Sequence, residues 1–313
     1  MDITRRSFLA VLLAVLLGSC ATERLTDVVT NATSTPAASA SAFPATVVDF
    51  QSRSTTIPKR PERIVSIGPS NTEYLFALGA GDRVVGVDDF SDTPAEAAKK
   101  EKVGGVKVNV EKVVSLRPDL IVTVKFSDGT IERLATTGAP VLVIDPQRLV
   151  EVARTAVVLG TAVGADGQQL ASDIERRVEA IRARTATAPK PRVYHEVDAS
   201  DPSKLYTVGP GSFIADIIDA AGGTNVAARA ATAYPQLSPE EVVRADPEVI
   251  VLGDADYGVG PDQVSARQGW SGITAVRTKR VFGITDSLVS RPGPRVAGAV
   301  EAYAKLLHPE LFR

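Results

Sequence analysis

Two glutamates occupy the same place in two copies of one sequence phrase. Residues 108–124 read VNVEKVVSLRPDLIVTV, and residues 237–253 read LSPEEVVRADPEVIVLG. In each copy a small polar residue, which can cap a helix, stands two places before the glutamate, Glu111 or Glu240. Each carboxylate is therefore expected in a first helical turn, where the helix dipole stabilises an anion by about 0.3–1 kcal/mol. Helix stabilisation alone is one explanation of the repetition.

Residues suited to covalent catalysis or metal binding are scarce. The chain contains one cysteine, Cys20, and two histidines, His195 and His308. A catalytic triad would have to use His195, which lies in a predicted strand, and the sequence has no Gly-x-Ser-x-Gly turn. Zinc or manganese would need three or four His and carboxylate ligands, which two distant histidines do not supply. We therefore expect that the protein is not an enzyme and holds no intrinsic cofactor or metal. The alternatives are an extracytoplasmic enzyme that acts on a metal chelate and a structural surface lipoprotein.

Length and composition indicate a soluble globular protein with two domains. A chain of 313 residues exceeds the usual size of one hydrophobic core. Hydrophobic residues make up 44% and charged residues 23% of the sequence, and the net charge is −2. This charge gives no basic surface for a polyanion, so nucleic acid is not an expected partner.

The first 20 residues carry an export signal. Arg5 and Arg6 precede an apolar stretch, 8–17, which is shorter than the roughly 20 residues of a membrane-spanning helix. The stretch ends in Leu-Gly-Ser-Cys, which resembles a bacterial lipobox and makes Cys20 the expected lipidated residue. Residues 1–20 are therefore predicted to be a lipoprotein signal peptide, and the product to be lipid-anchored at the outer face of the cytoplasmic membrane. The twin-arginine pattern at 4–9 and the general secretory route are alternative means of export.

Beyond the signal, a polar tether precedes two regions of alternating strands and helices. Residues 21–45 are rich in Thr, Ala, Ser, Asn and Pro and are expected to form a flexible tether. Short apolar strands alternate with helices in 46–160 and again in 190–313, which predicts parallel sheets covered by helices. Between them, 161–189 follows a helical pattern whose apolar face is Leu170, Ile174, Val178 and Ile181. The predicted fold is α/β, with two Rossmann-like lobes joined by a single long helix.

Five stretches in a fixed order resemble a known family. They are RIVSIGPSNTEYLFALGAGDRVVGVDDFSDTP (63–94), NVEKVVSLRPDLIV (109–122), YTVGPGSFIADIIDAAGGTNVA (206–227), YPQLSPEEVVRADPEVIVL (234–252) and SRPGPR (290–295). Together they resemble the substrate-binding proteins of ABC importers that carry ferric siderophores, haem and cobalamin. The cobalamin-binding members are nearest, because Ser-Asp-x-Pro, Pro-Gln-x-Ser and a late Pro-Arg occur in their order. The resemblance implies a rigid joining helix, a ligand cleft between the lobes and a monomer that delivers its ligand to a permease dimer with ATPase subunits.

The resemblance also assigns roles to individual residues. It implies that Glu111 and Glu240 project from the two lobe tips and meet arginines of the permease, whose two-fold symmetry would give each lobe one contact. The cleft is expected at the carboxyl ends of the strands. Aromatic faces there suit a large flat ligand, and guanidinium groups suit an anionic one. Matching of motifs gives these ligand-binding candidates: Pro69, Asn71, Phe90, Phe126, Tyr206, Tyr234, Asp286, Arg291 and Arg295.

The ligand implied by the resemblance is a ferric siderophore or a corrinoid. Cobalamin-binding relatives tend to line the cleft with tryptophans, whereas the single tryptophan here, Trp270, lies outside the matched stretches. Arginine and tyrosine fit a ferric siderophore at least as well. A haem receptor is the further alternative and would need an axial His or Tyr; His308, near the C-terminus, is expected on the surface.

Overall fold

The computed structural model describes residues 43–312. The predicted signal peptide, its Cys20, and residues 21–42 of the predicted tether lie outside the described residues. Within 43–312, none of the helices combines the length and the apolar character needed to cross a membrane.

The N-terminal lobe is built on a parallel sheet with strand order β5-β4-β3-β6-β7. An antiparallel hairpin of β1 (Ala45–Val48) and β2 (Ser54–Ile57) precedes it. The sheet strands are β3 (Ile64–Ser66), β4 (Val84–Val87), β5 (Glu101–Lys102), β6 (Leu120–Thr123) and β7 (Val141–Val143). The helices are α1 (Pro69–Ala77), α2 (Ala95–Ala98), α3 (Val110–Ser115) and α4 (Thr130–Ala135), with a 3-10 turn at Gly81–Arg83. Strand β6 is buried along its whole length, as its apolar run predicted.

Helix α1 begins earlier than the sequence pattern predicted. The stretch NTEYLFALGA predicts a helix over 71–80 with Asn71 or Thr72 as its cap, but the helix starts at Pro69 and its N-cap is Gly68. Gly68 has a φ of 112°, a conformation that a residue with a side chain rarely adopts, and proline is preorganised for the first helical position. Asn71 instead lies inside the helix, and its side-chain amide donates to the Ile67 carbonyl at 3.2 Å.

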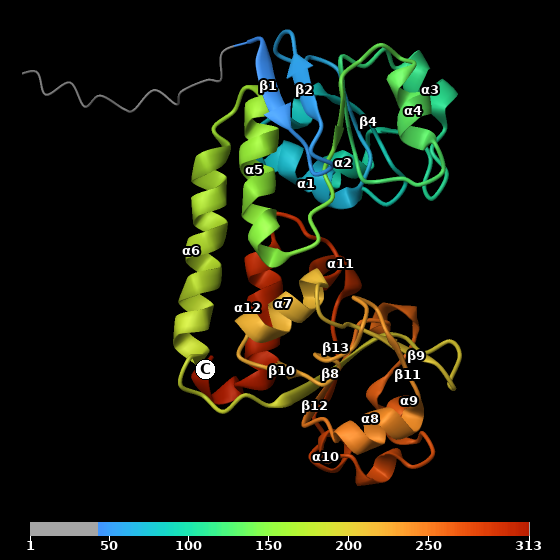
Figure 1. Cartoon of the computed structure of the whole chain (residues 1–313), viewed down its shortest axis with the longest axis vertical. Coiled ribbons are helices and arrows are strands. Elements are labelled where there is room, and N and C mark those ends of the chain that lie inside the picture. Colours follow the sequence, from blue (N-terminus) through green and yellow to red (C-terminus); the bar gives the residue numbers. More distant parts are fainter. Residues whose placement is uncertain (1–42, 313) are drawn as a thin grey trace, which may run out of the picture. The chain divides into compact units, whose positions relative to one another are not determined.

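Two long helices connect the lobes. Helix α5 (Leu149–Val163) is followed by α6 (Gly167–Thr185), whose first turn is capped by the Asp166 carboxylate. The predicted joining segment, 161–189, therefore contains α6 but begins inside α5. Figure 1 shows α6 running beside α5. The two helices approach closely at Gly167, where a Cβ would collide with the Ala156 carbonyl oxygen.

The C-terminal lobe has a mixed sheet with strand order β11-β9-β8-β12-β13, and β10 also pairs with β8. Strands β8, β12 and β13 are parallel, as expected, whereas β9 and β11 add an antiparallel wing that the sequence pattern did not predict. The strands are β8 (Arg192–Asp198), β9 (Leu205–Thr207), β10 (Thr224–Asn225), β11 (Gln236–Leu237), β12 (Val249–Leu252) and β13 (Val281–Gly283). The helices are α7 (Phe213–Ala220), α8 (Pro239–Ala245), α9 (Pro261–Ser265), α10 (Thr274–Arg277), α11 (Asp286–Val289) and α12 (Val296–Leu307). Short 3-10 turns lie at Ala255–Tyr257, Trp270–Gly272 and Pro309–Leu311.

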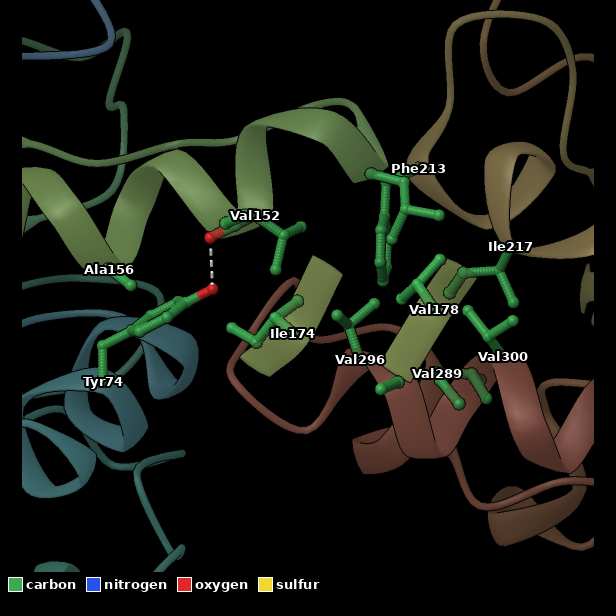
Figure 2. Packing of buried hydrophobic residues seen from close by; sticks show 14 of the residues in the cluster. Tyr74, Val152, Ala156, Ile174, Val178, Phe213, Ile217, Val289, Val296 and Val300 are labelled. Carbon is green, nitrogen blue, oxygen red and sulfur yellow. Dashed lines mark hydrogen bonds between the residues drawn. The ribbon is translucent and has the colours of Figure 1, made fainter. Parts of the chain in front are cut away.

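The joining helices are part of a continuous hydrophobic core. One buried cluster includes residues from both sheets and from helices α1, α5, α6, α7, α11 and α12. Figure 2 shows Ile174 of α6 near Val152 of α5 and Val296 of α12, and Val178 of α6 near Phe213 and Ile217 of α7. The Tyr74 hydroxyl of α1 donates to the Val152 carbonyl oxygen, which ties the N-terminal lobe to α5. Helix α6 is thus held along one whole face.

This packing leads us to expect only a small closure of the lobes on ligand binding. Hinge closure needs a few residues whose backbone dihedral angles can change by a large amount, whereas a packed core resists continuous deformation. Arg148 adds a second link, because its guanidinium donates to the Asp216 carboxylate of α7 at 2.7 and 2.9 Å. Small-angle X-ray scattering of the ligand-free and ligand-bound protein should give nearly superimposable curves. A marked compaction with ligand would show that the joint bends.

Candidate functional site

The two repeated glutamates occupy equivalent and exposed positions. Glu111 is the second residue of α3 and Glu240 is the second residue of α8. Capping is carried out by other side chains: the Asn109 side chain accepts from the Lys112 amide at 2.9 Å, and Ser238 and Glu241 form a capping box. Within residues 43–312 neither repeated carboxylate accepts a hydrogen bond or forms an ion pair, so both remain open to an external partner.

A hydrogen-bonded loop presents Phe90 at the carboxyl end of β4. The Asp88 carboxylate accepts from the backbone amides of Gly68 (2.7 Å) and Phe90 (2.9 Å) and from the Ser91 hydroxyl (2.7 Å). Ser91, Thr72 and Ser66 continue the network with hydroxyl contacts of 2.8 Å. This buried network fixes the loop, while the Phe90 side chain stays 52% exposed.

Two tyrosines lie on the antiparallel wing of the C-terminal lobe. Tyr206 in β9 is 40% exposed, and Tyr234, two residues before β11, is 49% exposed. Partial burial, and then the negative charge of Asp145, raise the pKa of Tyr234 above its usual value. Asp145 follows β7, so the charge that acts on Tyr234 belongs to the N-terminal lobe. Both rings could offer an apolar face and a hydroxyl to a large ligand.

The two arginines predicted as ligand contacts are paired with carboxylates of the N-terminal lobe. Arg295 makes a two-pronged contact with Glu73 of α1, at 2.7 Å for both Nε and Nη2. Arg291 donates through Nη1 to Asp92 at 2.6 Å and lies 3.6 Å from Glu73. The four side chains form a charge-balanced cluster between the lobes, which we call the cross-lobe cluster: Glu73, Asp92, Arg291 and Arg295.

Glu73 and Asp92 are the members of this cluster that were not among the sequence-derived candidates. By sequence Glu73 is only an acidic residue near the start of a predicted helix, but its side chain is buried against the C-terminal lobe. Asp92 belongs to the Ser-Asp-x-Pro motif, which served only to recognise the family. Tyr257 was not a candidate either; it is 78% exposed in the turn that follows β12.

The remaining candidates lie in different local environments. Pro69 opens α1, and Asp286 opens α11, where its backbone amide donates to the Asp256 carboxylate. Phe126 packs against the buried cluster that contains Val113 and Leu134, so core packing accounts for at least part of its ring. The ligand-binding roles of all nine candidates stay predictions.

Both histidines and the tryptophan are internal. His195 in β8 is paired with the Tyr303 hydroxyl at 2.6 Å, and burial lowers the pKa of its imidazole to about 4. The expected surface position of His308 is wrong: its side chain is buried and Nε2 lies 3.2 Å from the Gly222 carbonyl oxygen. Trp270 is fully buried with its ring edge-on to Tyr194. These three side chains are therefore not exposed to a ligand.

A buried carboxylate without a partner lies at the carboxyl end of β12. Asp254 is only 5% exposed, and within residues 43–312 neither of its carboxylate oxygens has a hydrogen-bond partner. The neighbouring carboxylate, Glu196, is neutralised by two contacts with the Arg267 guanidinium. Burial, and then the charge of Glu196, raise the pKa of Asp254 to about 6.

We expect this group to make the protein less stable as the pH rises from about 4 to about 6. The folded state holds the Asp254 proton more tightly than the unfolded state, so the associated stability is complete below pH 4 and is lost through pH 6. The loss is on the order of 2 kcal/mol. Asp254→Asn should remove this dependence and raise the free energy of unfolding at pH 7, measured by chemical denaturation. Asp262→Asn, an exposed control, should behave like the wild type; an equal pH dependence in Asp254→Asn would contradict the assignment.

Comparison with known proteins places the chain in a family. Residues 64–288 match the periplasmic binding protein family model. The chain is 37% identical to an ABC transporter substrate-binding lipoprotein of Bacillus subtilis, YvrC, over 87% of this chain and 88% of that protein. It is 31% identical to a cobalamin-binding protein of Halobacterium salinarum, over 86% of this chain and 75% of that protein.

Solved structures of two kinds of receptor share the fold. The vitamin B12-binding protein BtuF of Vibrio cholerae superposes with a TM-score of 0.70 at 27% identity, covering 82% of this chain and all of that one. The haem-binding protein RhuT of Roseiflexus sp. superposes with a TM-score of 0.69 at 26% identity, covering 80% and 99% of the two chains. The two-lobed α/β fold predicted from the sequence is confirmed by these neighbours and by the two sheets. The chain belongs to the periplasmic binding protein family, as a substrate-binding protein of an ABC importer.

Proposed function

We propose that the protein captures a corrinoid outside the cytoplasm and delivers it to the permease of an ABC importer. The observation that carries the proposal is the charge balance of the cross-lobe cluster, in which Arg291 and Arg295 are already paired with Asp92 and Glu73. Such a site leaves little positive charge for an anionic chelate, so a ligand without a large negative charge fits it best. The cobalamin-binding name of a relative agrees with this choice.

The exposed aromatic side chains support a large, partly apolar ligand. Phe90, Tyr206 and Tyr234 each keep between 40% and 52% of their surface exposed, although they border the carboxyl ends of the strands or the antiparallel wing. Aromatic rings bury much apolar surface at little conformational cost, which suits a macrocycle. A ferric hydroxamate without net charge meets the same requirement and is the second candidate, favoured by the two tyrosine hydroxyls. Haem fits less well, because its propionates would need unpaired cations. Neither histidine is accessible to its iron, so a tyrosine would have to serve as the axial ligand.

A calorimetric titration with cyanocobalamin, an uncharged ferric hydroxamate and haem tests the proposal. Cyanocobalamin should bind most tightly, and Tyr234→Ala or Phe90→Ala should weaken its binding by roughly tenfold, the equivalent of about 1.4 kcal/mol. Val114→Ala removes another exposed apolar side chain, on α3, and should leave the affinity unchanged. Tight binding of haem with no binding of cyanocobalamin would contradict the choice of ligand.

We further infer that a lipid on Cys20 holds the protein at the membrane. The lipobox-like Leu-Gly-Ser-Cys sequence and the lipoprotein name of the Bacillus subtilis relative support this. Cys20→Ala removes the only thiol, so the exported variant should move from the membrane fraction to the soluble extracytoplasmic fraction on cell fractionation. Continued sedimentation of the variant with the membrane would mean that another segment anchors it.

A further inference from the structure

The contact between Asp92 and Arg291 crosses from one lobe to the other. Asp92 follows β4 at the carboxyl edge of the N-terminal sheet, and Arg291 follows α11 beyond the carboxyl end of β13. Arg291 Nη1 donates to Asp92 Oδ1 at 2.6 Å, and Nη2 donates to Oδ2 and to the Phe90 carbonyl oxygen, both at 3.3 Å. The guanidinium therefore contacts both the side chain and the backbone of the 88–93 loop.

The two partners differ in their access to solvent. The Arg291 side chain is 15% exposed, whereas that of Asp92 is 60% exposed. A dissolved anion near this pair therefore encounters the exposed carboxylate more readily than the guanidinium. The hydrogen bond from Arg291 lowers the pKa of Asp92, so this carboxylate stays ionised at neutral pH.

The loop that carries Asp92 is held in place from its other side. The Lys102 ammonium donates to the carbonyl oxygens of Asp88 and Ser91 at 3.1 Å each. The Thr93 hydroxyl donates to Asp92 Oδ1 at 3.0 Å. These bonds orient the carboxylate towards Arg291 without help from a ligand, so moving it aside would cost several interactions.

Of the two carboxylates in the cross-lobe cluster, Asp92 is the one that can be neutralised without leaving a buried charge unpaired. Glu73 is 3% exposed and lies against both arginines, so its loss would leave buried positive charge. Asp92 touches only Arg291 within the cluster and faces solvent on its other side. Loss of its charge would leave two arginines with one carboxylate, a net positive site.

We propose that Asp92 determines the charge selectivity of the receptor: it occupies Arg291 and so excludes anionic metal chelates from the cleft. This inference rests on the proposed function, since it concerns the same cleft. Like-charge juxtaposition is a common means of rejecting wrong partners, and the cost falls here on ligands that carry negative charge near Arg291. A corrinoid without net charge is unaffected, whereas the trianionic ferric complex of three catecholates is repelled.

The test compares three proteins with two probes by calorimetry. Wild type, Asp92→Asn and Asp89→Asn are each titrated with cyanocobalamin and with a ferric tris-catecholate. Asp89→Asn makes the same change in net charge as Asp92→Asn. Asp89 is exposed, belongs to the same loop and forms no ion pair within residues 43–312, so its variant leaves the contact with Arg291 in place. Asp92→Asn should bind the ferric tris-catecholate roughly tenfold more tightly than the wild type, and Asp89→Asn should not. The gain should shrink at high salt and disappear in an Asp92→Asn, Arg291→Ala double variant.

The outcomes separate this inference from the proposed function. Equal catecholate binding by wild type and Asp92→Asn would overturn the role of Asp92, and so would an equal gain in Asp89→Asn, since net charge alone would then explain it. Cyanocobalamin binding by the wild type is judged separately. Its absence would overturn the corrinoid assignment, while the comparison of the three proteins with the catecholate would still decide the role of Asp92.

Discussion

A Glu111→Lys, Glu240→Lys double variant is expected to lose receptor-dependent uptake while it keeps its fold and its ligand affinity. Both carboxylates are exposed in the first turns of α3 and α8, and the caps of these helices are made by other residues. The helix dipole therefore allows only about 1 kcal/mol of lost stability for each change. If the permease presents arginines to these positions, each lysine meets a like charge, which can cost several kcal/mol of association. Glu240 also lines a hollow of about 700 Å³, together with Val243 and Arg244.

The control is a glutamate of the same kind that is not part of the repeat. Glu132 lies in the first turn of α4 and is exposed, so Glu132→Lys makes an equal charge change elsewhere on the N-terminal lobe. Ligand uptake and stimulation of the permease ATPase should stay normal for this variant. When the facing permease arginines are replaced by glutamates, uptake with the double variant should partly recover. Normal transport by the double variant would mean that the two glutamates do no more than stabilise the first turns of their helices.

Removal of one partner from the pair between Glu73 and Arg295 is expected to destabilise the protein by about 3 kcal/mol, because it leaves an uncompensated buried charge. Arg295→Met exposes this effect most clearly, since the Glu73 side chain is 3% exposed and keeps only the more distant Arg291. Chemical denaturation at pH 7 should show the loss in the free energy of unfolding.

Two further variants give this prediction its controls. Combining Arg295→Met with Glu73→Leu removes both charges, and much of the lost stability should return, since a buried ion pair often contributes little net stability. Lys305→Met breaks the exposed pair with Glu301 and should cost less than about 1 kcal/mol. If Arg295→Met weakens ligand binding but leaves stability unchanged, Arg295 is a ligand contact and not a structural link between the lobes.

Local features of the fold could be predicted from the sequence because their causes lie within a few residues. The Asn109 cap, the buried run of β6 and the apolar face of α6 each depend on near neighbours in the chain. The start of α1 was placed too late because the backbone preferences of Gly68 and Pro69 outweighed the side-chain caps that follow.

Features that depend on how distant segments meet could not be predicted in the same way. Glu73 pairs with Arg295 and Asp92 with Arg291 across about two hundred residues, and no local pattern indicates which residues pair. His308 lies near the C-terminus, yet α12 carries it back to the Gly222 carbonyl. The short strands of the antiparallel wing, β9 and β11, are stabilised by pairing with neighbouring strands more than by their own composition.

The most direct test of the account is uptake of radiolabelled cyanocobalamin by vesicles that contain the cognate permease and its ATPase subunits. ATP is supplied inside the vesicles, on the side of the ATPase subunits, and the receptor is added outside. The label should accumulate inside only when the wild-type receptor is present, and unlabelled cyanocobalamin should compete with it. A folded receptor that promotes no accumulation, or vesicles that accumulate the label equally well without it, would contradict the assignment of this protein as the corrinoid receptor of an ABC importer.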